Sequence, residues 1–226
     1  MNKLLVIENL TKIYSAGTPL EVRALKSINL EIEKGVFVYV LGPSGSGKTT
    51  LLNMAGLLDY PTAGKIYFKG DDVSLISEKK RAVIRNRSIG FIFQQPSFLP
   101  EFTALENVLM PALIGASDCK AARGRAEEFF EGVGMSARRN HFPSQLSGGE
   151  LQRLTILRAL INEPEIILCD EPTGQLDEDN AALVMKTLRE VARDGSSSVV
   201  FVTHNQVLTK DAETVINLRD GRISEE

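Results

Sequence analysis

Gly42-Pro43-Ser44-Gly45-Ser46-Gly47-Lys48-Thr49 follows directly on an apolar run, VFVYVL, over residues 36–41. The octapeptide matches the phosphate-binding pattern G-x-x-x-x-G-K-[ST] at every specified position. Its glycines let backbone N–H groups curl around phosphate oxygens, Lys48 reaches the β- and γ-phosphates, and the Thr49 hydroxyl is a ligand for Mg²⁺. A helix that begins near Gly47 directs the positive end of its dipole at the same anion. The stretch therefore predicts a nucleotide site on a strand–loop–helix unit.

The composition is that of one substantial globular domain. The chain has 226 residues, of which 43% are hydrophobic and 24% charged, and its net charge of −3 argues against wholesale binding to nucleic acid. No apolar stretch is long enough to cross a bilayer, and the apolar start ends at Glu8, too soon for a signal peptide. We expect a cytoplasmic protein that binds no nucleic acid, with Cys119 and Cys169 as thiols.

Strand and helix patterns alternate along most of the chain. Apolar runs predict strands over residues 4–10, 28–32, 36–41, 65–69, 89–93, 165–169 and 198–203. Helical spacing covers the stretch from Gly47 through Leu58, and residues 104–113, 121–133, 151–161 and 180–193. Asp220-Gly221 centres a hairpin over 215–223. This order predicts an α/β fold with a mainly parallel sheet, which binds ligands at the carboxyl ends of its strands.

The region from 96 to 145 has a different character, helical in pattern and broken by Pro, Gly and Asn. We interpret it as a helical lobe inserted into a core formed by residues 1–95 and 146–226. No repeat or charged linker divides the chain, so we expect one domain over residues 1–226.

Asp170 and Glu171 end an apolar strand, which places two carboxylates at the same edge as the phosphate loop. Asp170 is placed to hold Mg²⁺, directly or through water, and Glu171 to polarise an attacking water as a general base. The alternative is two acidic residues that cap a strand before the Pro172-Thr173-Gly174 turn. The intact phosphate loop upstream favours the metal and the base.

Ser147-Gly148-Gly149-Glu150 reads as a capping box, with Ser at the N-cap and Glu three positions later. A helix that starts with two glycines exposes its N–H groups and can dock on phosphate. The capping and the anion-binding interpretations use the same geometry.

Together with the phosphate loop, Leu146-Ser147-Gly148-Gly149-Glu150 resembles the signature of the ATP-binding-cassette (ABC) family. The resemblance extends from Tyr14 to His204 and implies a P-loop NTPase cassette with an antiparallel β subdomain, an ATPase that uses ATP and Mg²⁺. In this family the signature contacts the γ-phosphate bound by the opposite subunit, so the resemblance implies a homodimer or a paired cassette. Glu150 stands where Gln is commonest in the family, and Leu151 where a polar residue is usual.

The resemblance also implies roles for single residues. His204 would bridge the γ-phosphate and Glu171, Gln94 would reach Mg²⁺ and the water (Gln95 being the alternative), and Asp177 would lie in the loop that crosses the dimer interface. Tyr14 would stack on adenine, unless it is a core residue. The expected nucleotide-binding residues are Tyr14, Gly42, Pro43, Ser44, Gly45, Ser46, Gly47, Lys48, Thr49 and Thr50, and the expected metal ligands are Thr49, Gln94 and Asp170.

Phe98-Leu99-Pro100-Glu101-Phe102-Thr103 and the residues that follow it, to Met110-Pro111, resemble the subfamily that serves lipoprotein release and macrolide-type efflux. This implies integral membrane subunits that contact the lobe, and a place on the cytoplasmic face of the inner membrane. A cell-division cassette of the same subfamily is an alternative. The apolar residues Phe98, Leu99, Phe102 and Leu109 either line a groove for a short helix of the membrane subunit or belong to the lobe core.

Lys79, Lys80, Arg81, Arg85 and Arg87 form a basic run. It is either a solvated helix face or a contact with the membrane subunit or with anionic headgroups.

Two other classes of protein compete with a transporter subunit. A soluble cassette that acts on DNA or ribosomes is disfavoured, because no heptads are sustained and only one cassette is present. A catalytically silent regulator is disfavoured by the intact set of Lys48, Asp170, Glu171 and His204.

Overall fold

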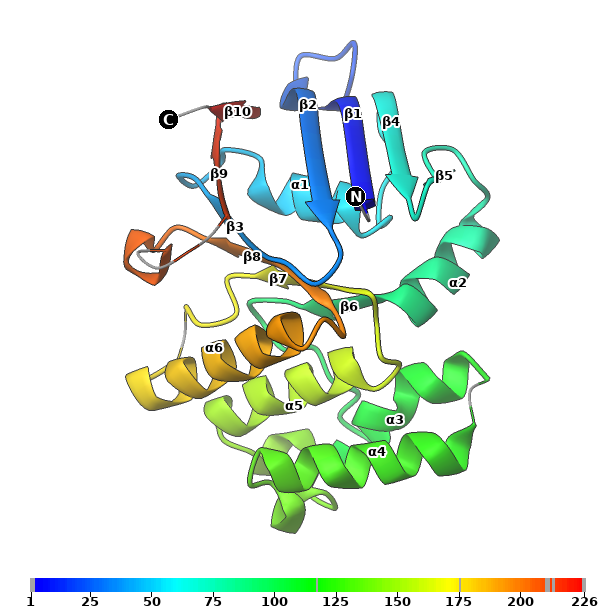
Figure 1. Cartoon of the computed structure of the whole chain (residues 1–226), viewed down its shortest axis with the longest axis vertical. Helices are drawn as coiled ribbons and strands as arrows, with labels where there is room; N and C mark the ends of the chain where they lie inside the picture. The colour runs from blue at the N-terminus through cyan, green and yellow to red at the C-terminus, as the bar shows by residue number, and fades with distance from the viewer. Residues whose placement is uncertain (1–2, 117, 175, 210–211, 213, 225–226) are drawn as a thin grey trace.

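The fold contains two sheets, with helices on both faces of the larger sheet and a helical lobe beyond it (Figure 1). A computed structural model describes residues 3–116, 118–174, 176–209, 212 and 214–224. The strands are β1 (Lys3–Tyr14), β2 (Val22–Glu33), β3 (Phe37–Leu41), β4 (Ala63–Phe68), β5 (Asp71–Asp72), β6 (Ile89–Ile92), β7 (Ile166–Asp170), β8 (Ser198–Thr203), β9 (Thr214–Arg219) and β10 (Arg222–Ser224). The helices are α1 (Lys48–Ala55), α2 (Glu78–Ser88), α3 (Ala104–Ile114), α4 (Cys119–Gly132), α5 (Gly148–Leu160) and α6 (Glu178–Arg193), with 3₁₀ turns η1 (Ser136–Arg138), η2 (Pro143–Gln145) and η3 (Gln206–Thr209).

The larger sheet has six strands in the order β10-β9-β3-β8-β7-β6. Strands β9, β3, β8, β7 and β6 pair in parallel, and β10 pairs antiparallel with β9 across the Asp220-Gly221 turn. The predicted mainly parallel sheet and the predicted hairpin are both confirmed.

Alternate residues of the central strands enter different cores, because successive side chains point to opposite faces of a sheet. Ile166 and Leu168 of β7 belong to one cluster, and Ile167 and Cys169 to the other. Both faces are covered, which explains why these strands read as continuous apolar runs rather than as alternating ones.

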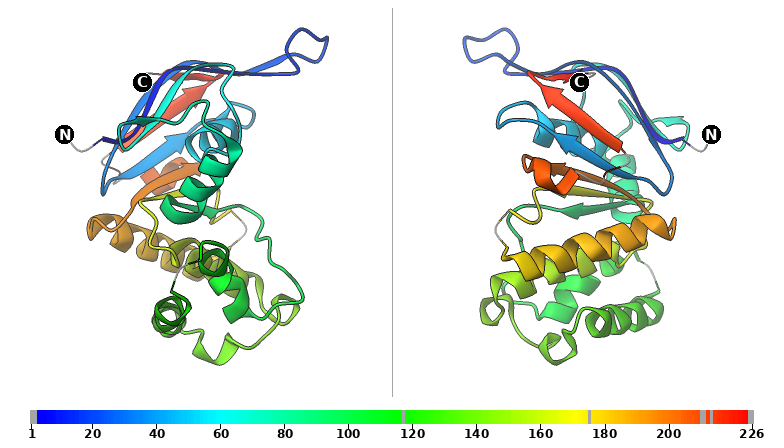
Figure 2. Two further views of the ribbon diagram at one scale, coloured as in Figure 1. Left: turned by 90° about the vertical axis from the view of Figure 1, so that its right-hand side faces the viewer. Right: turned by 60° about the vertical axis from the view of Figure 1, so that its left-hand side comes forward.

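The first face packs on α1 and on the antiparallel sheet β2-β1-β4-β5. Buried residues of α1, such as Leu51 and Met54, join one cluster with residues of both sheets. Seen from the side, the molecule is a stack of layers, with the antiparallel sheet at one end and the helical lobe at the other (Figure 2). Helix α1 is thereby held from both sides, and so is the phosphate loop that leads into it.

The second face packs on α5 and α6, and a third cluster lies between α3, α4 and α5. Helix α5 belongs to both clusters, with Ile156 and Ala159 against the sheet and Leu154 and Leu157 against the lobe. Helix α5, which begins within the signature residues 146–150 and is called the signature helix below, therefore joins the proposed lobe, residues 96–145, to the sheet. Among the described residues, no helix combines the length and the apolar character that a membrane span requires.

Several of the predicted elements have different bounds in the structure. The first two strands are much longer than expected, because Asn9 and Ser27 take left-handed φ angles of 49° and 56° at irregularities that interrupt the alternating pattern. The helix expected through Leu58 ends at Ala55, since Gly56 caps it and Leu57 turns the chain with φ 55°.

The basic run is partly misinterpreted from sequence. It lies on helix α2, where Lys79, Lys80 and Arg87 are exposed, but only 1% of Arg81 is exposed. The Arg81 Nε donates to the Leu57 carbonyl at 3.1 Å, and its guanidinium lies 3.9 Å from the centre of the Tyr60 ring. Arg81 thus anchors the turn after α1 and is neither a solvated residue nor a contact for a membrane.

Candidate nucleotide site

Four neighbouring parallel strands end at one edge of the six-stranded sheet, and chemistry-bearing residues follow each of them. The phosphate loop follows β3, and His204 follows β8. Asp170 ends β7 with Glu171 directly after it, and Gln94 follows β6. A cleft of about 870 Å³ opens there, a volume in the usual range for a ligand site. It is lined by Tyr14, Val22, Arg23, Ala24, Lys26, Ser44, Gly45, Gly47, Lys48, Thr49, Thr50, Gln94, Asp170, Glu171, His204, Asp220 and Gly221.

The phosphate loop wraps around the ammonium group of Lys48. Its Nζ donates to the carbonyls of Gly42 and Pro43, both at 2.8 Å, and the residue is 7% exposed. Gly42, Pro43 and Ser46 are not among the cleft-lining residues; Ser46 is 3% exposed, and its N–H donates to the Pro43 carbonyl at 3.2 Å. Of these three, Ser46 is buried and Pro43 is exposed away from the cleft, whereas Ser44, Gly45, Gly47 and Thr50 line the cleft.

Gly47 is required by its surroundings. It has a φ of 106°, and a Cβ built on it would lie 2.5 Å from the carbonyl oxygen of Ala24 in β2. Only glycine combines that φ with such a close backbone approach. The glycine that starts the phosphate-binding helix therefore also lets the antiparallel sheet close one side of the cleft.

Thr49 and Asp170 form a pair of oxygen ligands. The Thr49 hydroxyl donates to Asp170 Oδ2 at 2.9 Å. Burial raises the pKa of the Asp170 carboxyl, while the bond from Thr49 opposes the shift. A hydroxyl and a half-buried carboxylate beside a phosphate loop fit Mg²⁺, which takes a few protein oxygens together with phosphate oxygens and water.

Glu171 and His204 form a second pair at the mouth of the cleft. Glu171 Oε1 lies 3.0 Å from His204 Nδ1. Because an ionised carboxylate can only accept, Nδ1 donates in this contact, and Nε2 is left for another partner. Glu171 has a φ of 47°, a left-handed conformation that is costly for a side chain of this type and is found most often at functional sites. The Glu171 N–H donates to the Val202 carbonyl of β8 at 3.1 Å, which holds this backbone in place.

The remaining two predicted residues of the cleft, Gln94 and Tyr14, both line it, whereas Gln95 is not among the lining residues. Tyr14 is half-buried, so it is part of a wall rather than of the core. The Lys12 ammonium lies 4.8 Å from the centre of its ring, on the side of the antiparallel sheet.

Six lining residues were not predicted from sequence: Val22, Arg23, Ala24, Lys26, Asp220 and Gly221. Val22 pairs with Tyr14 across the β1–β2 hairpin, so a correct prediction of that hairpin would have found it. The Asp220-Gly221 turn reaches the cleft through two backbone bonds, from Lys26 N–H to Gly221 O and from Gly221 N–H to Ser46 O. Nothing local in the sequence signals those contacts.

The signature residues lie outside the cleft. Helix α5 starts at Gly148 with Ser147 as N-cap, and the capping box is complete, since Glu150 N–H donates to Ser147 Oγ and Ser147 N–H to Glu150 Oε2 at 2.8 Å. Glu150 Oε1 also accepts from Arg138 Nε at 2.7 Å. The bonds from Ser147 and Arg138 lower the pKa of Glu150 to about 2. Leu146, Ser147, Gly148, Gly149 and Glu150 are all absent from the cleft lining.

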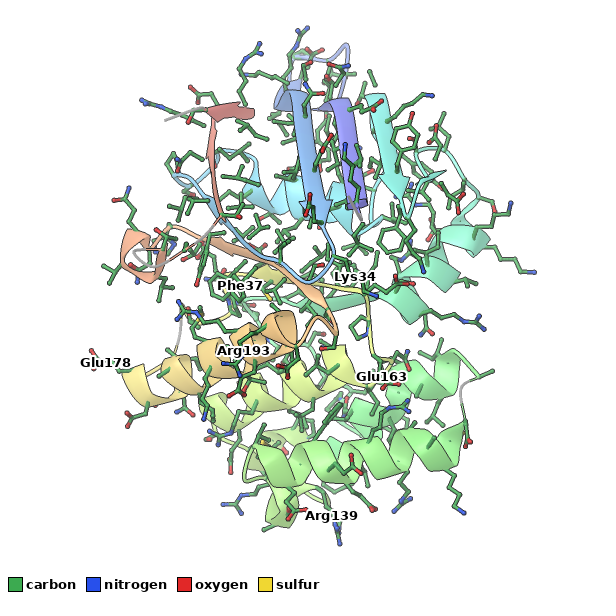
Figure 3. All side chains as sticks on the ribbon, viewed as in Figure 1. Lys34, Phe37, Arg139, Glu163, Glu178 and Arg193 are labelled. Carbon is green, nitrogen blue, oxygen red and sulfur yellow. The ribbon has the colours of Figure 1, made fainter. Side chains whose placement is uncertain are left out.

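Asp177 is the N-cap of α6, so the helix begins at Glu178 rather than near residue 180 (Figure 3 labels Glu178). The backbone N–H of Asn180 donates to Asp177 Oδ1, and the Asn180 side-chain amide donates to both carboxylate oxygens, at 2.9 and 2.8 Å. These bonds, the backbone one first, lower the pKa of Asp177. In the stretch from Gly174 to Asp177, which resembles the ABC interface loop, Gln175 lies outside the described residues.

Asn180 also reaches the signature helix, a contact that sequence reasoning missed. Its Oδ1 accepts from Arg153 Nη1 at 2.6 Å, and its amide would lie 2.7 Å from a Cβ on Gly149. One side chain thus links the loop of Asp177 to the signature.

Comparisons with known proteins show which family the chain resembles. The family model described as "ABC transporter" matches residues 25–174, more than half of the chain. An uncharacterized ABC transporter ATP-binding protein of Methanocaldococcus jannaschii is 49% identical and is covered over 96% of both chains. The lipoprotein-releasing system ATP-binding protein LolD of Pseudomonas syringae pv. tomato is 44% identical over 98% of this chain and 97% of its own length. The solved ATP-binding cassette MJ0796, a dimeric post-hydrolysis state bound to ADP and Pi, matches with a TM-score of 0.90 and 39% identity over 98% of this chain and 97% of that one.

Proposed function

The chain belongs to the ABC transporter family, whose ATP-binding subunits are ATPases, and we propose that it powers the release of lipoproteins from a membrane. The assignment to lipoprotein release is supported by the name of the Pseudomonas relative and by the resemblance of residues 98–111 to that subfamily. Macrolide-type efflux and cell division are the alternatives within the subfamily.

The reaction rests on one observation: the Thr49–Asp170 pair and the Glu171–His204 pair face the same cleft as the phosphate loop. Bound Mg²⁺ neutralises phosphate charge and orients the terminal phosphate. Thr49, Asp170 and Gln94 are the residues that would hold it. Lys48 would transfer its hydrogen bonds from two loop carbonyls to the β- and γ-phosphates.

Glu171 would accept the proton of the attacking water while His204 holds its carboxylate and contacts the γ-phosphate. Tyr14 would stack on the adenine at the other end of the cleft.

Two chains are needed for a complete site. Gly148 and Gly149 present their N–H groups at the start of α5, and Ser147 presents its hydroxyl, all outside the chain's own cleft, where they can contact ATP held by a second chain. We propose a homodimer or a paired cassette in which Asp177 lies at the interface; the solved relative is dimeric.

A groove between α2, β6, α3 and α5 is the proposed contact for an integral membrane subunit. It has a volume of about 380 Å³ and includes Phe91 and Phe93, whose stacked rings lie 5.6 Å apart. Phe98, Leu99, Phe102 and Leu109 are not among its lining residues. Phe98 and Leu109 pack on the lobe core, and Leu99 and Phe102 are 45% and 38% exposed. A peripheral position on the cytoplasmic face of the inner membrane follows from this proposed contact.

Replacement of Glu171 by Gln tests the reaction. Glu171→Gln keeps the size and loses the base, so we expect phosphate release to fall at least about a hundredfold while ATP-dependent dimers accumulate. Phosphate release is measured against Glu178→Gln as a control, an exposed change on α6. A Glu171→Gln chain with the parent's turnover would contradict the role of this residue.

A pull-down from membranes tests the transport assignment. We expect an integral membrane protein to co-purify, and lipoprotein release by the reconstituted complex to require ATP. Loss of this membrane protein on Phe93→Asp, with the ATPase activity of the isolated chain retained, would support the groove. A reconstituted complex that exports a macrolide and releases no lipoprotein would favour the alternative.

A further inference from the structure

The start of helix α5 combines two features that oppose one another. Its exposed N–H groups attract an anion, whereas the carboxylate of Glu150 lies in the same first turn. A carboxylate there stabilises the helix but repels a phosphate that approaches the same N–H groups. The structure contains a group that resolves this conflict.

That group is Arg138, which ends the 3₁₀ turn η1 on the lobe. Arg138 Nε donates to Glu150 Oε1 at 2.7 Å, and the side chains of Arg138 and Glu150 are 47% and 16% exposed. Within the described part of the chain, Arg138 is the cationic side chain that forms an ion pair with Glu150. His141 Nε2 lies 3.4 Å from the other end of the guanidinium.

The turn that carries Arg138 is fixed at both ends. The Arg138 N–H donates to the carbonyl of Met135, which is 1% exposed, and the Arg138 carbonyl accepts from His141 N–H. The carbonyls of Arg139 and His141 then accept from the N–H groups of Leu105 and Ala104 at the start of α3. The guanidinium is therefore presented by a part of the lobe whose backbone is held by hydrogen bonds to neighbouring elements.

Arg138 also fixes where the Glu150 charge lies. With Oε1 held by Arg138, Oε2 stays on the Ser147 N–H at 2.8 Å, and Ser147 Oγ accepts from the Glu150 N–H at 3.3 Å. Because the Ser147 oxygen accepts this bond, its own O–H proton is available to donate to an anion.

We propose that Arg138 is a positioning residue for ATP docking: it cancels the charge of Glu150 and keeps that carboxylate on the Ser147 N–H, so that the start of α5 attracts the terminal phosphate held by a second chain. This inference rests on the proposed pairing of two cassettes. It assigns to the lobe a part in the electrostatics of the site and not only in its position.

The test uses the full-length chain with Glu171→Gln and measures, by sedimentation, the ATP concentration at which half of the protein is dimeric. Arg138→Met leaves one uncompensated negative charge, and we expect about a five- to tenfold higher ATP concentration at low salt, with a smaller difference as salt screens the repulsion. Adding Glu150→Gln to Arg138→Met removes that charge and should return the value close to the parent's. Arg139→Met is the matched control. Arg139 is the next residue along the chain, is exposed and is labelled in Figure 3, so this change also removes one positive charge.

The possible outcomes are distinct. A double variant as weak as Arg138→Met would overturn the proposal, because a purely structural role for Arg138 is not repaired by loss of Glu150 charge. An Arg139→Met chain as weak as Arg138→Met would also overturn it, in favour of a general effect of positive charge. A parent that stays monomeric at saturating ATP, with all variants alike, would overturn the pairing of cassettes, and this inference with it.

Discussion

At the scale of the residue, the cleft shows how function is gained at the expense of local stability. Asp170 is a partly buried carboxylate beside a second one, Glu171, and Glu171 itself has a left-handed backbone. Both features are unfavourable in the isolated chain, and under the proposed function both are used when a cation and a phosphate bind. Such sites are where substitutions can stabilise a protein while they abolish its activity.

Asp170→Asn should therefore raise the stability of the nucleotide-free chain. Burial raises the pKa of Asp170, so its ionised form costs folding free energy at neutral pH, and an amide still accepts the bond from Thr49. We expect the free energy of unfolding to rise by on the order of 1 kcal/mol at pH 7. Urea denaturation measures it.

The same variant should lose the additional stabilisation that Mg²⁺ gives to the ATP-bound chain. A nucleotide-free Asp170→Asn chain less stable than the parent would contradict this account. Thr50→Ser is a suitable control, as it changes a neighbouring cleft residue without a change in charge.

At the scale of the element, helix α5 and the N-terminus of α6 are the parts that link lobe, sheet and interface. Helix α5 contributes to two hydrophobic clusters, its first turn is held by Arg138, and Arg153 holds Asn180 of α6. A continuous set of contacts thereby joins the lobe to Asp177 through α5 and Asn180.

Asn180→Ala tests that link. The backbone N–H of residue 180 still caps α6 through Asp177, so the helix should remain, while the side-chain bonds to Asp177 and Arg153 are lost. At about 1 kcal/mol for each hydrogen bond, we expect kcat to fall about fivefold or more, with the affinity of the monomer for ATP unchanged. Steady-state kinetics and nucleotide binding separate the two effects. Lys186→Ala, exposed on the same helix, is the control, and an equal loss in both variants would argue against a specific link.

The cap of α5 gives the protein a defined acid sensitivity. The pKa of Glu150 is about 2 in the folded chain, against an ordinary value of 4.5, so its contribution to stability is complete above about pH 5 and is lost as the pH falls towards 2. The groups that face Glu150 are Ser147 and Arg138, with His141 beside the latter.

Glu150→Gln keeps the capping geometry but does not titrate. We expect the parent to be about 1 kcal/mol more stable than this variant at pH 7, after allowance for solvent screening near the surface, and the difference to disappear only as the pH falls to about 2. Denaturation at a series of pH values measures the difference. Parallel curves for the two chains would show that Glu150 is not the titrating group.

At the scale of the whole molecule, the two functional surfaces are separate on one chain. The cleft lies at the edge of the sheet, and the signature lies on α5 outside it. The proposed activity should therefore depend on encounter between chains.

ATP hydrolysis per chain should increase with protein concentration and level off once pairs form. A mixture of Lys48→Met and Ser147→Arg chains should recover activity that neither chain has alone, because a mixed pair contains one complete site. Phosphate release from the mixture measures this. Activity that is independent of concentration, with no recovery in the mixture, would indicate a monomeric enzyme.

The sequence by itself determined the sheet strands, the phosphate loop, the carboxylate pair after β7 and the cap of α5. These are local features: each is specified by the spacing of apolar residues or by one residue type at a strand or helix end. They also carried the resemblance to the ABC family, and that resemblance implied the P-loop cassette and the roles of Gln94 and His204.

Only the tertiary structure decided which residues meet across long separations in the chain. The Asp220-Gly221 turn reaches the cleft, Ala24 demands a glycine at position 47, and Arg81 turns inward to hold the end of α1. The same holds for Asn180 against Gly149, and for Arg138 on Glu150. The physical reason is that such contacts depend on how helices and sheets pack, and a turn, an arginine or an asparagine has the same local pattern whether it is buried, paired or solvated.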